Sequence, residues 1–315
     1  EISECLVGSE MCIRDSVRDK MKEFSTQDVL IGRISRTYLI DNYLIVTDYN
    51  SPDKLIHLFD KNTFEHLASS TYQGQGPGEI TIIGHVGIDE TNRRFFVSDH
   101  GKLKIFAYDL DSVLTTPEYQ PSVKIDMKKK LFPDDYLYLN DTLCIARIIE
   151  PIGNNDYKPS VARWNMATGE INPMPYEYPD LKKVRFIYAA SAEHQLYVQC
   201  YTQYDLMTIC DFNGNLKCNI YGPKWVNEKT QTQHYSLGVE FCGDKILALY
   251  SGGDHRTDAY YPTKFLVFDL NGNYLKTLET GYMITDFCYD KENNRLIINL
   301  NDEIQFAYLD LEGII

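Results

Sequence analysis

A strand-and-turn unit recurs six times along this 315-residue chain and constrains its fold more than any other feature. In each copy an aromatic or apolar run ends in Asp or Asn and is followed by a turn. The copies end at Asp60, Asp109, Asn165, Asp211, Asp269 and Asp310, at intervals of 41 to 58 residues. Asp and Asn bond their own backbone in turns, and "NGN" between apolar runs is typical of a β-hairpin.

A second series of short apolar runs keeps the same spacing. These runs follow polar turns, carry the β-branched and aromatic bias of strands, and begin at Tyr43, Arg94, Thr142, Gln195, Lys245 and Arg295. Two series in phase predict an all-β fold, a six-bladed β-propeller with four antiparallel strands per blade. A β-sandwich would not show this period, and a β-helix has a shorter one.

Closure of the ring requires a strand from the N-terminal region. Few residues follow Asp310, too few for a turn and a good outer strand. Residues 20–32 are therefore predicted to complete the sixth blade, and residues 33–42 to form the inner strand of blade one. The alternative is that the C-terminus is truncated.

Residues 1–16, "EISECLVGSEMCIRDS", have no counterpart in the repeats. They closely resemble a translated sequencing adapter, which suggests a non-native leader followed by a single propeller domain over residues 17–315. On this hypothesis, any signal peptide or lipid-anchoring cysteine stood upstream of a lost native start.

Charge and cysteine usage narrow the classes of partner. The formal net charge of −14 repels phosphate backbones, so nucleic acid is not an expected partner, and membrane contact is expected only through a lost lipid anchor. Outside the leader, the six cysteines form no Cys-x-x-Cys pair and no His cluster accompanies them. No cofactor and no metal site are predicted, although the sequence does not exclude calcium binding. The protein is expected to be a monomer.

The stretch "TYQGQGPGEI" at residues 71–80 has the glycine content of a nucleotide-binding loop but not its pattern. Gly78 comes one position too early for a dinucleotide fingerprint, Pro77 interrupts it, and a strand-like run follows. The structural interpretation is a compact loop between blades one and two, in which Glu79 accepts hydrogen bonds from loop N–H groups. The functional alternative is that the N–H groups of Gly76 and Gly78 line a ligand site near the central channel.

The same stretch carries a family resemblance. Its Gly-x-Gly-Pro-Gly-Glu pattern resembles a signature of TolB-like six-bladed β-propeller proteins of Bacteroidetes, many of which are described as lipoproteins. The runs "YLIVTDYN" and "FFVSDHG" also look like TolB-like and NHL-like blades. This resemblance implies the propeller fold and a periplasmic or outer-membrane-anchored location, and it brings no catalytic site.

Three long connections are predicted on one face, together with the glycine loop: residues 147–160, 221–236 and 251–264. Their aromatic, Arg, Asp and His side chains suit the binding of sugars or peptides, although a rim of mobile loops is an equal alternative. His85, which opens an inner strand, could face the channel, although a lone histidine is more often structural. The candidate ligand-binding residues are Gly76, Gly78, Glu79, His85, Arg147, Glu150, Trp225, His255, Arg256 and Tyr260.

No hydrolase, zincin or EF-hand motif is present, so no catalytic residue is predicted. The leading hypothesis is a non-enzymatic envelope propeller that binds a small molecule, a glycan or a protein on the face with the long loops. The alternative is a lactonase-like hydrolase with a divalent metal in the central channel, since ligands from separate blades share no local motif. A third reading is a scaffold within an envelope complex.

Overall fold

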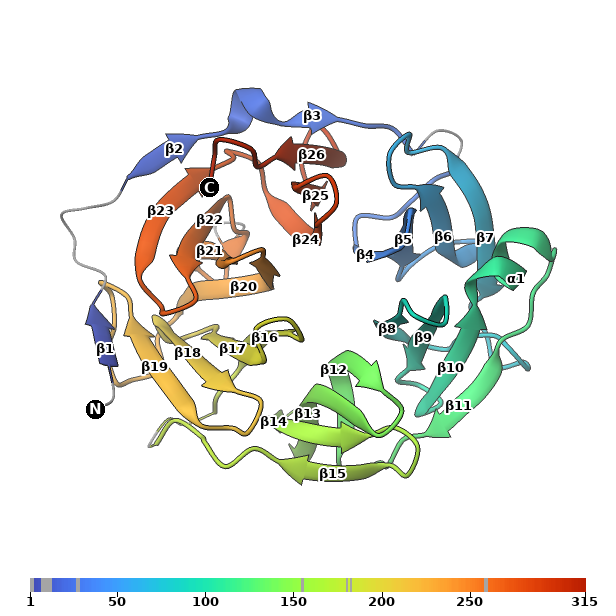
Figure 1. Cartoon of the computed structure of the whole chain (residues 1–315), viewed down its shortest axis with the longest axis horizontal. Coiled ribbons are helices and arrows are strands. Elements are labelled where there is room, and N and C mark those ends of the chain that lie inside the picture. Colours follow the sequence, from blue (N-terminus) through green and yellow to red (C-terminus); the bar gives the residue numbers. More distant parts are fainter. Residues whose placement is uncertain are drawn as a thin grey trace. The chain divides into compact units, whose positions relative to one another are not determined.

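The computed structural model describes residues 3–6, 13–26, 29–153, 156–179, 181, 183–257 and 260–315. The chain is a six-bladed β-propeller with four antiparallel strands in each blade, as the sequence predicts (Figure 1). It divides into two compact units, Phe24–Pro173 with blades one to three, and Glu1–Glu23 with Met174–Ile315, which holds blades four to six. No helix in the described part of the chain has the length and apolar character to cross a bilayer.

The unit Phe24–Pro173 contains three complete blades in chain order. Blade one comprises β4 (Ser35–Ile40), β5 (Tyr43–Asp48), β6 (Lys54–Asp60) and β7 (His66–Tyr72). Blade two comprises β8 (Ile83–Asp89), β9 (Arg94–Asp99), β10 (Lys104–Asp109) and β11 (Ser122–Asp126), with the short helix α1 (Leu110–Thr115) before its outer strand. Blade three comprises β12 (Phe132–Asn140), β13 (Leu143–Gly153), β14 (Asp156–Asn165) and β15 (Glu170–Pro173).

The other unit contains blades four to six. Blade four comprises β16 (Phe186–Ser191), β17 (Leu196–Tyr201), β18 (Leu206–Asp211) and β19 (Leu216–Tyr221). Blade five comprises β20 (Thr232–Cys242), β21 (Lys245–Asp254), β22 (Lys264–Asp269) and β23 (Tyr274–Glu279). Blade six comprises β24 (Ile284–Asp290), β25 (Arg295–Leu300), β26 (Phe306–Asp310) and the N-terminal strand β3 (Lys22–Glu23).

The pairing of β3 with β26 confirms that an N-terminal strand completes the sixth blade (Figure 1). Two further N-terminal strands, β1 (Ser3–Leu6) and β2 (Arg14–Ser16), pair in parallel with β19 and β23, and a 3₁₀ turn (Arg18–Lys20) follows them. Residues 1, 2 and 7–12 of the predicted leader, Cys12 included, lie outside the described residues, so its origin stays a prediction. The six cysteines beyond the predicted leader are all buried: Cys144, Cys200, Cys210, Cys218, Cys242 and Cys288.

The predicted loop over residues 147–160 is wrong in its secondary structure. Strands β13 and β14 continue through it as a long hairpin, with Arg147 opposite Val161 and Glu150 opposite Lys158. Pro151, Pro159 and Gly153 give this stretch the composition of a loop, yet all three lie within strands. Likewise β21 extends to Asp254 and shortens the predicted connection over residues 251–264.

Apolar side chains from neighbouring blades meet in continuous cores within each unit. Their fully or almost fully buried members include Leu58 and Phe95 between blades one and two, Phe96 and Trp164 between two and three, Val198 and Phe268 between four and five, and Leu249 and Leu296 between five and six.

The turn residues act as the sequence predicts: Asp211, for example, accepts the N–H groups of Asn213 and Asn215 at 2.8 and 2.9 Å.

Buried carboxylates fasten the crossing loops between blades. Asp99 at the end of β9 is fully buried, and its side chain accepts four main-chain N–H groups at 2.8 to 3.1 Å, from Thr81, Ile82, Gly101 and Lys102. Asp48 ends β5 in the same way and accepts the N–H of Gly32 at 2.7 Å. Because an ionised carboxylate is costly to bury unless it is hydrogen-bonded, these bonds fix the path of both loops that they join.

Two histidines share one hydroxyl in blade one. His57 Nδ1 and His66 Nε2 each lie 2.8 Å from Ser69 Oγ. Burial, helped by the neighbouring His66 and opposed by the Asp48 and Asp53 carboxylates, lowers the pKa of His57 from 6.5 to about 4. The neutral imidazole is therefore the form that the fold accommodates.

Replacing Asp99 with Asn should lower the free energy of unfolding by about 2–4 kcal/mol, because an amide removes the charge and turns one acceptor into a donor that faces N–H groups. Urea denaturation followed by circular dichroism measures the change. Asp53→Asn, on an exposed side chain of the same face, is the matched control and should stay within about 0.5 kcal/mol of the unchanged protein. Equal losses in the two variants would contradict the fastening role.

The protein should become less stable as the pH falls from 6.5 to 4. In this window the unfolded chain protonates His57 and the folded chain does not, so stability is complete above pH 6.5 and lost towards pH 4, by about 2–3 kcal/mol from this residue. His57→Asn, whose side-chain oxygen can replace Nδ1, should flatten the dependence in unfolding curves recorded at several pH values. An unchanged slope in this variant would show that other groups are responsible.

Candidate functional site

The candidate residues fall into both units, and each unit is considered by itself. Gly76, Gly78, Glu79, His85, Arg147 and Glu150 belong to Phe24–Pro173, whereas Trp225, His255, Arg256 and Tyr260 belong to the unit of blades four to six. The second group lies on the loop 222–231, which joins blade four to blade five, and on the connection after β21.

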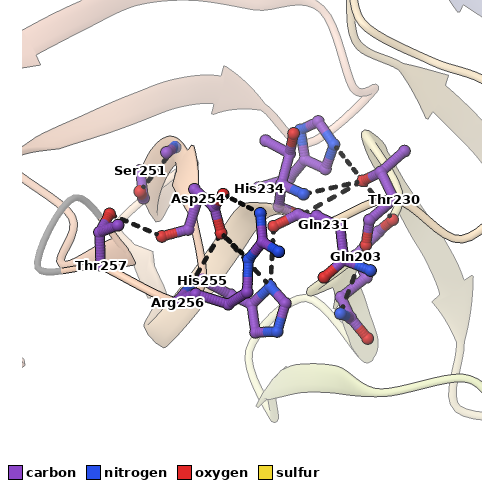
Figure 2. Close-up of polar contacts among 11 residues, drawn as sticks. Gln203, Thr230, Gln231, His234, Ser251, Asp254, His255, Arg256 and Thr257 are labelled. Atoms are coloured by element: carbon purple, nitrogen blue, oxygen red, sulfur yellow. Dashed lines mark hydrogen bonds and ion pairs between the residues drawn. The ribbon is translucent and has the colours of Figure 1, made fainter.

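A polar cluster forms where the end of β21 meets the loop before β20 (Figure 2). It consists of Gln203, Thr230, Gln231, Asp254, His255 and Arg256. The His255 main-chain N–H and ring Nδ1 both bond the carbonyl oxygen of Gln231, at 3.1 and 2.9 Å. Since Nδ1 donates this bond, the neutral ring has Nε2 as an acceptor. His255 is 36% exposed, so its ring is both oriented and accessible.

Arg256 is oriented by Asp254 two residues earlier. The guanidinium Nε and Nη2 bond the two carboxylate oxygens at 3.1 and 2.7 Å, and this ion pair holds the pKa of Asp254 well below its usual range. The carboxylate uses two of the five guanidinium N–H donors. With 66% of its side chain exposed, Arg256 can present the other donors to a ligand.

Thr230 and Gln203 hold the loop against blade four. Thr230 Oγ1 donates to the carbonyl oxygen of Gln203 at 3.1 Å, and the Gln203 side-chain amide donates to the carbonyl oxygen of Thr230 at 3.4 Å (Figure 2). The sequence analysis did not single out these two residues. They act through the main chain, and short polar residues in a loop carry no spacing signal for such contacts.

Beneath the polar cluster lies a buried relay of Asp205, His234 and Tyr250. The Tyr250 hydroxyl donates to Asp205 Oδ1 at 3.3 Å and lies 3.2 Å from His234 Nδ1, while His234 Nε2 is 3.5 Å from Thr230 Oγ1. Burial raises the pKa of Tyr250, and the Asp205 carboxylate adds to that rise. Burial lowers the pKa of His234, and the same carboxylate opposes this change. Asp205 and His234 are each 1% exposed, so they cannot contact a ligand, and the relay positions the loops above it.

An aromatic cluster of Tyr178, Tyr204, Tyr221 and Trp225 stands at the other end of the loop 222–231. The ring centroid of Trp225 is 5.1 Å from that of Tyr221, 5.9 Å from that of Tyr178 and 6.3 Å from that of Tyr204. Tyr204 is almost completely buried, whereas the other three rings are partly exposed. Asp205 links this cluster to the relay, because it accepts the N–H of Lys224 at 2.9 Å.

Tyr260 lies beyond the polar cluster, on the connection to β22. Its ring centroid is 4.3 Å from that of Tyr261, with an angle of 30° between the planes. The main-chain N–H of Tyr260 bonds the carbonyl oxygen of Thr257 at 3.1 Å. Both rings are partly exposed and add apolar surface to this connection.

In the other unit, residues of the glycine loop and Lys102 bond several of the loop's main-chain groups. Glu79 Oε2 accepts the N–H of Gly76 at 2.7 Å, and Lys102 Nζ donates to the carbonyl oxygens of Gly76 and Glu79 at 2.9 and 2.8 Å. A Cβ atom at Gly74 would lie 2.0 Å from Glu79 Oε2, which explains the small residue there. Of the two N–H groups that the functional alternative offers to a ligand, that of Gly76 is bonded within the loop, and the alternative stays a prediction.

His85 joins the inner strands β8 and β12. Its Nδ1 lies 3.1 Å from Asp135 Oδ1, and its Nε2 lies 2.8 Å from the carbonyl oxygen of Tyr136. Arg147, from β13, forms a two-pronged ion pair with Asp134 at 3.0 and 2.9 Å. Burial lowers the pKa of His85, whereas Asp135 opposes that change. With protein acceptors at both ring nitrogens, His85 is suited to a structural role.

The remaining candidates are dispersed. Glu150 is exposed on β13, three residues beyond Arg147. Among the described residues, no three or more His, Cys, Asp or Glu side chains are grouped as metal ligands would be. The metal-dependent alternative stays a prediction.

Gly78→Ala should lower the free energy of unfolding by about 1–3 kcal/mol, because Gly78 has a φ of +72° and a Cβ there would lie 2.0 Å from Gln120 Oε1. Gly153→Ala is the matched control, since a Cβ there would meet nothing within 4 Å. The double variant with Gln120→Ala should recover only the clash and not the backbone strain. Thermal and urea unfolding measure all three; a neutral Gly78→Ala would contradict the explanation.

Comparison with known proteins gives the fold and no more specific identity. Residues 24–141 match the model of a family described as DUF5128, 6-bladed beta-propeller. No curated protein matches the sequence. Family match and strand topology together establish the six-bladed propeller, while the TolB-like relationship stays a prediction.

Three solved structures resemble the whole chain at low identity. A DUF4221 family member from Bacteroides vulgatus has a TM-score of 0.58 at 12% identity, covering 92% of this chain and 95% of its own. A candidate exported protein from Bacteroides fragilis has a TM-score of 0.58 at 9% identity, covering 98% and 99%. The extracellular domain of a candidate hybrid two-component system from B. thetaiotaomicron has a TM-score of 0.52 at 11% identity, covering 87% of this chain and 32% of that one. At these identities the likeness shows the propeller fold alone.

Proposed function

We propose that this protein is a non-enzymatic carbohydrate-binding propeller of the bacterial envelope, and that blades four and five contact the glycan. The observation that carries the proposal is the partly exposed Trp225, braced by three tyrosines at one end of a loop whose other end carries oriented polar side chains. An aromatic ring held in one position stacks on the apolar face of a sugar with little loss of side-chain entropy.

The polar cluster supplies what a sugar requires in addition to stacking. Sugar hydroxyls both donate and accept hydrogen bonds, and the cluster offers guanidinium donors on Arg256, a carboxylate on Asp254 and an acceptor nitrogen on His255. These side chains are oriented by bonds within the protein, so a ligand does not have to order them. Their charges nearly balance, which favours a neutral or weakly charged glycan.

An envelope location is supported by two independent observations. The Gly-x-Gly-Pro-Gly-Glu pattern resembles that of envelope lipoproteins, and two of the similar structures are named as an exported protein and as an extracellular domain. A glycan is a ligand that such a compartment contains. Lipid anchoring belongs to this proposal.

Trp225→Ala should weaken glycan binding at least about tenfold, and Arg256→Ala about three- to tenfold, because the first removes the stacking surface and the second removes hydrogen-bond donors. Calorimetric titration of the full chain with a panel of oligosaccharides identifies a ligand and measures both changes. In the unchanged protein, ligand-induced changes in tryptophan emission should come from Trp225, because the only other tryptophan, Trp164, is 2% exposed.

The control is Tyr72→Ala, which removes an exposed aromatic side chain (40%) from the other unit and should leave the affinity unchanged. Circular dichroism establishes that each variant is folded. The proposal is wrong if no oligosaccharide binds at millimolar concentration, or if Trp225→Ala binds as tightly as the unchanged protein.

A further inference from the structure

The outer edges of blades four and five each hold a fifth strand, which no other blade has in the described part of the chain. Strand β1 lies along β19, and β2 lies along β23 (Figure 1). Both added strands run parallel to their neighbours, whereas the four strands within each blade are antiparallel. These two edges therefore accept a strand that is not part of the repeat.

The two added strands are held by different interactions. At β23, the flanking Val17 is fully buried in the core of blades five and six and donates its N–H to the carbonyl oxygen of Glu279 at 2.9 Å. Lys276 also pairs with Asp15 at 2.9 Å. The blade-five edge thus selects its occupant through an apolar anchor and charge complementarity.

At β19 the pairing is a main-chain ladder. Its register runs from Ser3 opposite Cys218 to Leu6 opposite Tyr221. An edge strand offers a row of N–H and C=O groups, and an extended segment satisfies them whatever its side chains are. If residues 1–16 are a non-native leader, as the sequence suggests, then β1 stands in for a strand of another origin.

The surroundings of β19 suit a peptide. Because the added strand is parallel, its C-terminal end lies at Tyr221, whose hydroxyl is 3.3 Å from that of Tyr178 and whose ring packs against Trp225. Asn219, in the middle of β19, is fixed by the Tyr176 and Thr208 hydroxyls, at 3.0 and 2.8 Å. The middle of the edge is therefore braced, and partly exposed aromatic surface lies at the end where the guest strand finishes.

We propose that the outer edge of blade four is a docking site for an extended peptide segment of a partner protein, which adds to β19 as a parallel fifth strand. In this chain residues 3–6 occupy the edge in cis. The partner segment has no proline across the four register positions and carries an apolar or aromatic residue where it reaches Tyr221 and Trp225. The docking site rests on main-chain pairing along β19, and it meets the proposed glycan site at Trp225 alone.

The test displaces the cis strand in the full chain and supplies the same strand in trans. Glu4→Pro combined with Cys5→Pro prevents β1 from pairing. Alternate residues of a strand direct their N–H and C=O groups at a given neighbour, so one of these two residues bonds β19, and proline there has no N–H to donate. Hydrogen exchange is then measured at the amides of Leu216–Tyr221. The guest is a synthetic peptide of residues 2–8 with Cys5→Ser, and its control is the same peptide with prolines at positions 4 and 5.

Exchange at the outward-facing amides of β19 should accelerate at least about tenfold in the double variant and slow again when the guest peptide is added, but not with the proline control. Exchange at Tyr274–Glu279 should stay constant, because β2 is untouched. In fluorescence anisotropy, the labelled peptide should bind the double variant at least about tenfold more tightly than it binds the unchanged protein, in which β1 occupies the edge.

Equal exchange in the two proteins, or a guest peptide that protects none of these amides, would overturn the proposal. Protection of β23 in place of β19 would overturn it as well, since the peptide would then have chosen the other edge. Neither readout contains carbohydrate, so a failure of glycan binding leaves these outcomes unaffected.

Discussion

In three blades a carboxylate that is almost completely excluded from solvent holds a loop at the end of the blade. Asp48 and Asp99 accept N–H groups from the loop that leads into their own blade, and Asp205 accepts one from the loop that leaves its blade. Burying an ionised group costs several kcal/mol unless hydrogen bonds compensate for the lost water, and here main-chain N–H groups provide them. The constraint is mutual: each carboxylate is tolerated because the loops donate to it, and the loops follow one path because that carboxylate is there.

This constraint has opposite consequences at two equivalent loops. The loop after β7 is closed by its own residues, with Glu79 bonding Gly76 and Lys102 bonding two carbonyl oxygens, so its polar main chain is used within the protein. The loop after β19 is anchored from below by Asp205 and leaves Trp225 partly exposed. The glycine-rich loop is the more conspicuous in the sequence, but the loop with the buried anchor has the side chains available for a ligand.

The sequence was informative where structure is decided locally. Asp and Asn at the turns, with the apolar runs before them, predicted six blades, their strand order and the N-terminal strand of the sixth blade, because turn chemistry depends on neighbouring residues alone. The long hairpin of β13 and β14 was missed, since Pro151, Gly153 and Pro159 are typical of loops and only pairing across the hairpin overrides that preference. The sequence did not predict the relay. His234 lies within the connection 221–236 that the sequence singles out, but Asp205 and Tyr250 come from two other segments, and nothing in their spacing shows that they meet. The repeated Asp that closes a strand in blades one and two does not point to Asp205, which directly precedes β18.

The two added strands show how an edge can be selective or tolerant. At β23, Val17 fills a place in the hydrophobic core, so a guest without an apolar residue there would leave a cavity and lose stability. At β19, main-chain pairing provides affinity without choosing side chains, and the neighbouring tyrosines and Trp225 can only add preference at one end. Because β2 and Val17 are held at β23 by contacts that do not involve β19, the exchange of β1 that we propose at blade four would leave the anchor at blade five in place.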